Sequence, residues 1–186
     1  MTGITSLGQT QLSDIPILEN DRLRLRPHAI SDLDQLAEMW TNPDYVRYIG
    51  NLTRSKAEVW KAIQSTIGSW ALLGYGYWVI ETREHGEFVG ETGFLESVRP
   101  VEPDHVGTPE AGWGIVPNQW GKGYASEALA TIVKWADGVF PDKRTVCMIE
   151  TSHEASVRVA EKNGFVFAYQ TMLGDDAVQI FERNGL

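Results

Sequence analysis

The sequence predicts an α/β protein of one domain, with about seven strands and about four helices along its 186 residues. Two periodicities support this class. Apolar residues alternate with polar ones in several short segments, which is typical of half-buried strands, and recur at every third or fourth position in others, which is typical of amphipathic helices. With 42% hydrophobic and 22% charged residues, a chain of this length can bury its own core.

The chain begins with one strand and two helices. Leucines alternate with arginines over 22–26, which predicts a strand. Apolar residues at helical spacing over 33–40 predict a helix that the following Asn-Pro pair ends. Ser55 and Glu58 form a capping-box pattern ahead of an apolar stripe, so we expect a second helix that ends at Gly74.

The middle of the chain contains three strands and a helix. The segments 77–82 and 88–95 are strand-like and are joined by a polar turn with a glycine, which predicts a hairpin. After a loop with three prolines, 110–116 predicts another strand. The helix over 124–137 has an apolar face, and we expect Gly138 to end it.

The C-terminal part is predicted to continue with a strand, a helix and two strands. The strands cover 144–151, 165–169 and 177–181, and the helix over 154–163 ends at Gly164. Neither an internal repeat nor a second domain is visible in the sequence.

Composition and charge disfavour several classes of protein. The net charge of -9 argues against a protein that binds nucleic acid through clustered Lys and Arg. No apolar run is long enough to span a bilayer, and the N-terminus lacks the pattern of a signal peptide. Residues 1–17 predict a flexible N-terminal arm ahead of a domain over 18–186. We therefore expect a cytoplasmic protein with neither a membrane nor a nucleic-acid partner.

The cysteine and histidine content argues against disulfide bonds and metal sites. The single cysteine, Cys147, excludes an internal disulfide framework, and its strand-like neighbours predict a small buried side chain rather than a nucleophile. The four histidines show no paired metal-ligand spacing, so no metal site is expected.

The segment from Val116 to Ala128 has the clearest chemical pattern: a strand, a turn with two glycines and a helix. Glycines remove side chains where a backbone must approach a phosphate. The free N–H groups of the next helical turn then point at the anion with the favourable end of the helix dipole. From this spacing alone, both a phosphate cradle and a plain structural turn stay open.

The residues around this turn resemble the GNAT superfamily, and within it the branch typified by ribosomal-protein N-terminal acetyltransferases. In that branch Trp-Gly-Lys-Gly-Tyr-Ala, here residues 120–125, is the acetyl-CoA pyrophosphate loop. The segments 22–27, 42–48 and 155–165 are similar to other stretches of the same branch. The resemblance implies a mostly antiparallel mixed sheet with a splayed parallel pair. It also implies direct transfer of an acetyl group from acetyl-CoA to a primary amine, without an acyl-enzyme and without a metal.

The resemblance further implies a set of cofactor-binding residues. The first group is the backbone at the end of the strand before the turn, and the second is the turn itself with the first residues of the helix. The third is a position where family members commonly carry an Asn that contacts the pantetheine arm. In this chain they are Ile115, Val116, Trp120, Gly121, Lys122, Gly123, Tyr124, Ala125, Ser126 and His153.

Two catalytic residues are expected from the same resemblance. Glu110, at the start of the strand before the turn, is the candidate base that deprotonates the amine through water, with Glu91 in reserve. The alternative for Glu110 is a solvated carboxylate at a strand end. Ser156 is the candidate acid for the CoA thiolate, and local capping of its helix is the alternative. Tyr169 is a third choice for the acid.

The sequence leaves the acceptor and one alternative function open. A protein N-terminus, a polyamine, an antibiotic or another small amine suits the branch, and the acidic net charge favours a cationic acceptor only loosely. The alternative is a CoA-binding sensor or regulatory module without acetyl transfer. An ATP or NAD enzyme is disfavoured, because the turn lacks the P-loop and the three-glycine patterns. A homodimer paired through an exposed strand edge is compatible with the fold.

Overall fold

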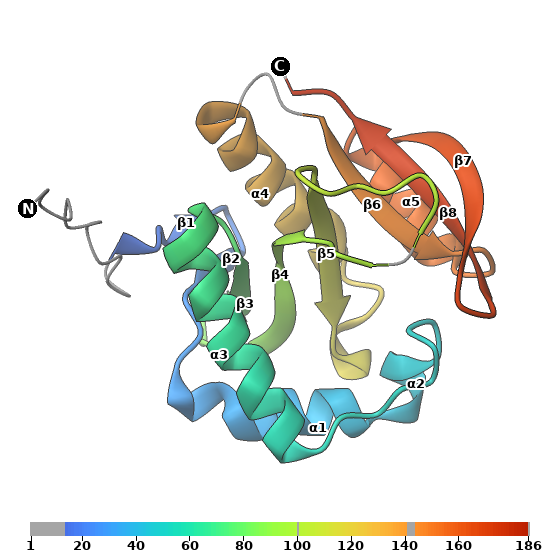
Figure 1. Cartoon of the computed structure of the whole chain (residues 1–186). Coiled ribbons are helices and arrows are strands. Elements are labelled where there is room, and N and C mark those ends of the chain that lie inside the picture. The colour runs from blue at the N-terminus through green and yellow to red at the C-terminus, as the bar shows by residue number, and fades with distance from the viewer. Residues whose placement is uncertain (1–13, 100, 141–143, 186) are drawn as a thin grey trace, which may run out of the picture.

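A single mixed sheet with helices on both sides makes up the computed structural model, which describes residues 14–99, 101–140 and 144–185 (Figure 1). The strands lie in the order β1-β2-β3-β4-β5-β6-β8-β7. Their bounds are β1 Leu18–Glu19, β2 Leu23–Arg26, β3 Tyr77–Thr82, β4 Phe88–Glu96, β5 Pro109–Ile115, β6 Thr145–Glu150, β7 Val166–Leu173 and β8 Asp176–Arg183. The α-helices are α1 Leu33–Thr41, α2 Pro43–Val46, α3 Lys56–Leu73, α4 Tyr124–Val139 and α5 Glu154–Lys162.

One pair of neighbouring strands differs from the rest. All other neighbours in the sheet run antiparallel, whereas β5 and β6 run parallel. Within the described residues this pair shares one register position, Glu110 beside Val146, so the two strands diverge toward their C-terminal ends. The predicted mixed sheet with a splayed parallel pair is therefore confirmed.

The sequence missed two short elements. Strand β1 has two residues and helix α2 has four. Neither is long enough to show a periodic pattern, so periodicity could not predict them. Both depend on contacts with distant segments: β1 pairs with β2, and α2 buries Tyr45 and Val46 under α1 and α3.

The predicted ends of α4, β7 and β8 are wrong. β7 continues to Leu173 instead of ending at residue 169, and β8 continues to Arg183 instead of residue 181, because the two strands pair along almost their whole length.

Gly138 does not end α4, which continues to Val139 with Phe140 as its C-cap. Phe140 is buried and lies 5.6 Å from Phe94 and 5.8 Å from Trp135 between ring centroids. Packing of Phe140 therefore decides where the helix stops. A glycine inside a helix costs only about 1 kcal/mol, which this packing offsets.

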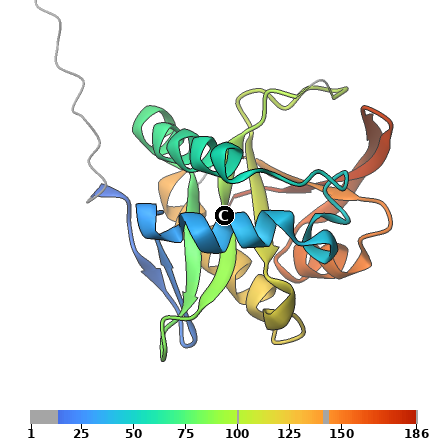
Figure 2. The same cartoon turned by 90° about the horizontal axis from the view of Figure 1, so that it is seen from below.

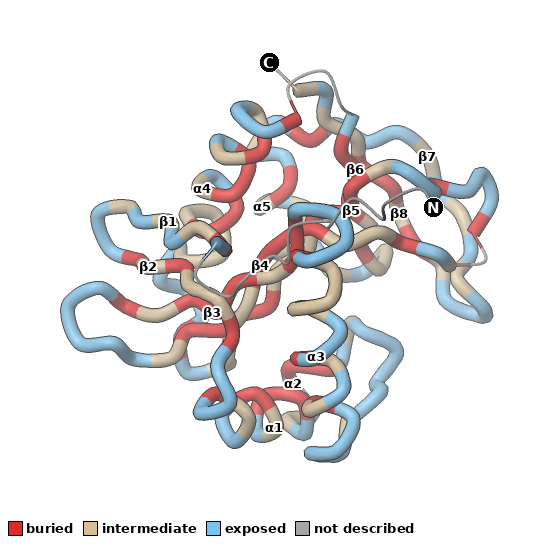
Figure 3. The backbone as a smooth tube through the Cα atoms, turned by 60° about the vertical axis from the view of Figure 1, so that its left-hand side comes forward, coloured by how far each residue is buried: buried red, intermediate tan, exposed pale blue. Residues whose placement is uncertain are grey.

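Two apolar clusters cover the sheet from opposite sides. Figure 2 shows α3 on one side of the strands and α4 and α5 on the other. The buried face of α4 packs on the sheet through Ala128, Leu129, Ile132, Val133 and Ala136. A smaller cluster joins α1, α2 and α3 through Leu36, Met39, Trp40, Tyr45, Val46, Val59 and Ile63. Buried backbone accordingly runs through the central strands and α4, while exposed backbone follows the loops (Figure 3).

The predicted N-terminal arm, residues 1–17, falls mostly outside the described residues. At its described end, Ile15 is buried, and Trp78 Nε1 donates a hydrogen bond of 2.7 Å to the carbonyl of Pro16. Packing therefore begins a few residues before the boundary predicted at residue 18. None of the helices in the described ranges has the length and apolar character needed to cross a bilayer.

Candidate active site

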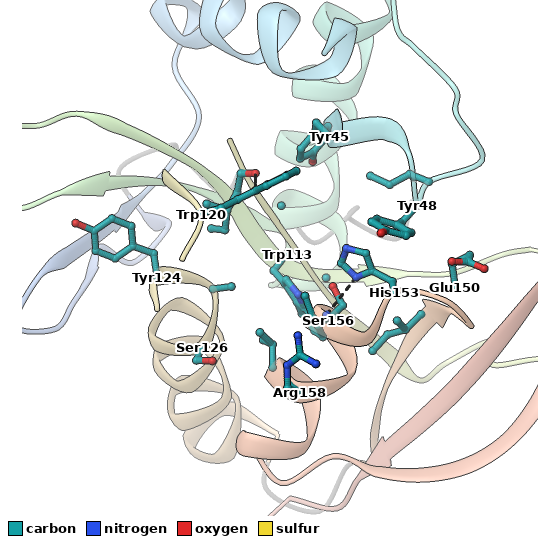
Figure 4. Close-up of a pocket in the computed structure, with 18 of the residues that line it drawn as sticks. Tyr45, Tyr48, Trp113, Trp120, Tyr124, Ser126, Glu150, His153, Ser156 and Arg158 are labelled. Carbon is teal, nitrogen blue, oxygen red and sulfur yellow. Dashed lines mark hydrogen bonds between the residues drawn. The ribbon is translucent and has the colours of Figure 1, made fainter. Parts of the chain in front are cut away.

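A cleft of about 620 Å³ opens where β5 and β6 diverge. Because the divergence leaves a gap in the sheet, the cleft connects the side of α4 and α5 with the side of α2. Figure 4 shows Tyr45 and Tyr48 on one side, Ser126 and Arg158 on the other, and Trp113 between them. Most predicted site residues line this cleft: Ile115, Trp120, Gly121, Gly123, Tyr124, Ala125, Ser126, His153 and Ser156.

The turn before α4 is shaped by its two glycines. Gly121 and Gly123 have φ angles of 75° and 84°, in the left-handed region that favours glycine. Gly123 is the N-cap of α4 and supplies no side-chain hydrogen bond to the first helical turn. The turn is anchored from outside, because Arg22 donates a 2.8 Å hydrogen bond to the Lys122 carbonyl and pairs with Glu127. The start of α4 therefore faces the cleft without a cap, as an anion site requires.

The structure places two predicted cofactor residues away from the cleft lining. Lys122 Nζ donates a 2.6 Å hydrogen bond to Gln119 Oε1, and the Lys122 side chain is exposed. Val116 uses both backbone groups internally: its N–H donates to Val89, and its carbonyl accepts from Gln119 N. Of the two residues predicted at this strand end, Ile115 lines the cleft, whereas both backbone groups of Val116 are already bonded.

The backbone groups of β5 that face the gap belong to Ile115 and Trp113. In an antiparallel ladder successive residues direct their N–H and C=O groups to opposite sides. Because Val116 bonds to β4, Ile115 and Trp113 direct theirs toward β6, where the parallel partner has diverged. The carbonyl of Ile115 accepts a 2.6 Å hydrogen bond from Trp120 Nε1. Trp113 thus joins the site through its strand position.

The start of α5 is capped by a histidine. His153 Nδ1 accepts a 3.2 Å hydrogen bond from Ser156 N, so in the neutral ring the proton is assigned to Nε2. Burial lowers the pKa of His153, with Glu150 partly opposing that shift. The ring lies 4.0 Å from that of Tyr48, edge to face. Capping thus belongs to His153 and not to Ser156, whose hydroxyl has no hydrogen-bond partner among the described residues.

Both candidate bases lie beside the cleft rather than in its lining. Glu110 is buried, with 6% of its surface exposed, so the alternative of a solvated carboxylate is wrong. Arg99 pairs with Glu110 Oε1, while Oε2 is buried without a partner in the described part of the chain. Glu91 has both oxygens engaged, at 3.2 Å by Trp40 Nε1 and at 3.3 Å by His28 Nε2.

Tyr169 is placed away from the cleft lining. Its hydroxyl lies 2.7 Å from His105 Nε2, and the two rings stack. Burial raises the pKa of this phenol. These contacts make Tyr169 part of the packing between β7 and the loop before β5.

Two basic side chains of the site were missed. Arg158 and Lys162 line the cleft from α5. They are four residues apart and therefore share one helix face. That spacing was visible in the sequence, but only the position of α5 beside the gap gives it meaning.

Metal and thiol chemistry find no support in the described ranges. Among residues 14–99, 101–140 and 144–185, no group of three or more His, Cys, Asp or Glu side chains is placed to hold a metal ion. Cys147 is 1% exposed, and burial raises the pKa of its thiol. It behaves as the small buried side chain that its neighbours predict.

Comparison with known proteins identifies the family. The family model described as Acetyltransferase (GNAT) domain matches residues 22–166. The chain belongs to the GNAT acetyltransferase family. An N-acetyltransferase of Bacillus subtilis (strain 168), YoaA, named as uncharacterized, is 30% identical over 151 residues, which cover 81% of this chain and 82% of that protein. This GNAT chain is therefore an N-acetyltransferase.

Solved structures share the fold. A GNAT-family acetyltransferase from Bordetella pertussis has a TM-score of 0.81 and 27% identity, and the match covers 90% of this chain and 99% of that one. RimL, a ribosomal L7/L12 alpha-N-protein acetyltransferase solved with coenzyme A, has a TM-score of 0.74 at 19% identity and covers 91% of this chain and 98% of its own. The predicted GNAT fold is confirmed by these similarities.

Proposed function

We propose that this GNAT enzyme moves the acetyl group of acetyl-CoA directly to a primary amine. The observation that supports this most is the uncapped start of α4, which opens onto a gap in the sheet. A diphosphate would bind the N–H groups of the first turn of α4. Arg158 and Lys162 add positive charge on the α5 side for the remaining phosphate of the cofactor.

The pantetheine arm would run through the gap between β5 and β6. Its amides would bond to the backbone N–H of Ile115, whose carbonyl is held by Trp120, and to the backbone groups of Trp113, all of which face the gap as they would face a neighbouring strand. His153 presents its Nε2–H from the opposite wall, in place of the Asn amide of related enzymes. The thioester would then reach the side of α2, where the acceptor enters past Tyr45 and Tyr48.

Glu110 is the base in this proposal. Its free, buried Oε2 can accept a proton from the acceptor through a water molecule, whereas both oxygens of Glu91 are held by Trp40 and His28. The neutral amine then attacks the thioester carbonyl, the C–N bond forms, and the C–S bond breaks. Ser156, whose hydroxyl lies at the cleft, is the proposed donor to the departing CoA thiolate, and it regains a proton, through water, from the nitrogen that has formed the new C–N bond. The buried Cys147 supports transfer without an acyl-enzyme.

The acceptor is proposed only as a class: a primary amine, either at a protein N-terminus or on a small molecule. Membership of the ribosomal-protein N-terminal acetyltransferase branch stays part of this proposal, since the likeness to RimL at 19% identity is one of fold. A homodimer and a cytoplasmic location also stay predictions. For the homodimer, β7 is the longer of the two edge strands of the sheet.

Thermal unfolding with acetyl-CoA, CoA, ATP and NADH tests the cofactor. A ligand that binds only the folded state raises the unfolding midpoint with its affinity and concentration. We expect shifts with both CoA compounds and none with ATP or NADH. A larger shift with NADH, or none with CoA, would contradict the assignment of the start of α4. Thiol release with polyamines, and with a peptide before and after blocking its N-terminus, then identifies the acceptor.

The base is tested once an acceptor is found. We predict that Glu110→Gln lowers kcat by about 100-fold to 10,000-fold, the usual range for loss of a general base, and leaves the acetyl-CoA Kd within about twofold. Glu91→Gln is the matched control and should retain most of the activity. The unfolding midpoint of each variant reports whether loss of the Arg99 pair has disturbed the fold. If Glu91→Gln has the larger effect, the roles of the two carboxylates are exchanged.

A further inference from the structure

Two glycines of β5 have no conformational reason to be glycine. Gly112 and Gly114 are not among the glycines with a positive φ, so their backbone is one that any residue can adopt. A glycine inside a strand weakens it and often marks a place where another group approaches closely. The lack of room for a side chain, rather than the backbone conformation, therefore explains why residues 112 and 114 are glycines.

The approaching groups are two tyrosine hydroxyls. A Cβ built at Gly112 would overlap the hydroxyl of Tyr77, and one built at Gly114 would overlap the hydroxyl of Tyr45. Tyr77 reaches β5 from β3, across β4, whereas Tyr45 comes from α2. Two elements far apart in the sequence thus place their phenol tips in the space that side chains of β5 would fill.

These hydroxyls are available for a ligand. Tyr45 and Tyr77 form hydrogen bonds through their backbone, but neither hydroxyl has a partner among the described residues. Burial, with a further contribution from Glu91, raises the pKa of both phenols, so both stay protonated and uncharged. Tyr45, Gly112 and Gly114 line the cleft, and the Tyr77 hydroxyl lies against Gly112, directly behind that lining.

Their place along β5 corresponds to the acyl end of the cleft. Moving inward from the turn before α4, the cleft passes Ile115, Gly114 and Gly112, and it closes where Glu110 pairs with Val146. A cofactor that enters with its phosphates at α4 therefore brings its thioester to the two glycines. The two hydroxyls fill the space beside Gly114 and Gly112 that an acyl chain longer than acetyl would need.

We propose that the hydroxyls of Tyr45 and Tyr77, seated against Gly114 and Gly112, form the end wall of the acyl pocket and restrict the donor to acetyl-CoA. This inference rests on the proposed function, because it assumes that the cofactor enters at α4. It assigns acyl-chain selectivity to these two phenols and to the two glycines that admit them.

Binding of acyl-CoA compounds tests the wall without knowledge of the acceptor. Kd is measured by titration calorimetry for CoA, acetyl-CoA, propionyl-CoA and butyryl-CoA. For the unaltered protein we expect CoA and acetyl-CoA to bind alike and butyryl-CoA to bind at least about tenfold more weakly, the usual penalty for surplus methylenes in a closed pocket. Equal affinity for all four compounds would overturn the inference while supporting the proposed function. Loss of all binding would overturn both.

Removing the hydroxyls should open the pocket. Tyr45→Phe and Tyr77→Phe each delete one oxygen, about the size of a methylene. We expect each to bring propionyl-CoA within about threefold of acetyl-CoA, and the double variant to do so for butyryl-CoA. Tyr169→Phe is the matched control, because it removes a tyrosine hydroxyl that is held by His105 away from the cleft lining. If the double variant still binds butyryl-CoA more weakly than acetyl-CoA by the same factor as the unaltered protein, the proposal is overturned.

A second pair of variants tests the wall from the side of β5, and the unfolding midpoint of each variant reports whether its fold is intact. Gly112→Ala adds a Cβ that pushes the Tyr77 hydroxyl into the pocket, so acetyl-CoA should bind more weakly than CoA by at least about fivefold. In the Tyr77→Phe background the oxygen is gone and the remaining tight contact, 3.0 Å to Cζ of the ring, needs only a small shift of the ring, so acetyl-CoA should again bind like CoA. If Gly112→Ala weakens acetyl-CoA equally in both backgrounds, Tyr77 does not form the wall.

Discussion

Helices α3 and α4 begin in opposite ways. In α3, Ser55 at the N-cap accepts from Glu58 N, and the Glu58 carboxylate accepts a 2.8 Å hydrogen bond from Ser55 N. In α4, the N-cap is Gly123, which has no side chain and leaves the first turn open toward the cleft. In α3, side chains of the helix itself bind the free N–H groups of its first turn. In α4, these N–H groups stay available for a ligand.

The start of α5 combines both arrangements. It is capped, as in α3, but the capping group is the ring of His153, which also lines the cleft. Ser156 donates its N–H to that ring, so the cap and the proposed acid are one hydrogen bond apart. The helix start is thereby coupled to a titratable group. Substitutions at the three helix starts should therefore have three different consequences.

The largest effect is expected on acetyl-CoA binding, when a capping side chain is added at the N-terminus of α4. Gly123→Asn supplies a capping side chain in a left-handed position that Asn tolerates better than most residues. Because this amide competes with the phosphates, we expect the acetyl-CoA Kd to rise by about 100-fold, roughly the loss of one or two charge-assisted hydrogen bonds. Gly174→Asn is the control, since Gly174 has a φ of 60° and lies outside the cleft lining. Unaltered binding in Gly123→Asn would show that α4 does not hold the anion.

A smaller effect, on stability, is expected when the capping side chain at the N-terminus of α3 is removed. Ser55→Ala removes the capping hydroxyl and should lower the free energy of unfolding by about 1 kcal/mol, or the midpoint by about 2–4 °C. The acetyl-CoA Kd should stay within about twofold. Ser126→Ala, in the first turn of α4, is the matched control and should change stability by less than about 0.5 kcal/mol. Equal losses in the two variants would remove the distinction between the helices.

The smallest effect is expected at α5 and depends on pH. Since burial lowers the pKa of His153, the folded state binds this proton less readily than the unfolded state, whose ordinary value is about 6.5. Stability linked to His153 is thus complete above about pH 6.5 and is lost as the pH falls through the lower folded value. Protonation also removes the acceptor for Ser156 N.

Midpoints measured between pH 8 and pH 5 check this dependence. His153→Asn keeps a capping side chain that does not titrate, so its midpoint should fall less on acidification than that of the unaltered protein. The exposed His85 supplies the control, because His85→Asn should leave the slope unchanged. A steeper fall in His153→Asn would contradict the sign of the shift.

Local features of this protein were predictable from residues close together in the sequence. The capping box of α3, the hairpin of β3 and β4, and the glycine turn before α4 each depend on a few neighbouring residues. Their hydrogen bonds and backbone angles form within that short segment. For the same reason, most of the predicted cofactor residues line the cleft: the turn already contains the backbone that faces it.

Only the tertiary structure decided which distant groups meet. Gly138 failed as a terminator because Phe140 is buried against Phe94 and Tyr75, which are distant in the sequence. Glu110 is buried beside Arg99, and Tyr77 reaches Gly112 across a whole strand. Burial, ion pairing and close approach depend on segments that folding brings together, and no local pattern in the sequence records that proximity.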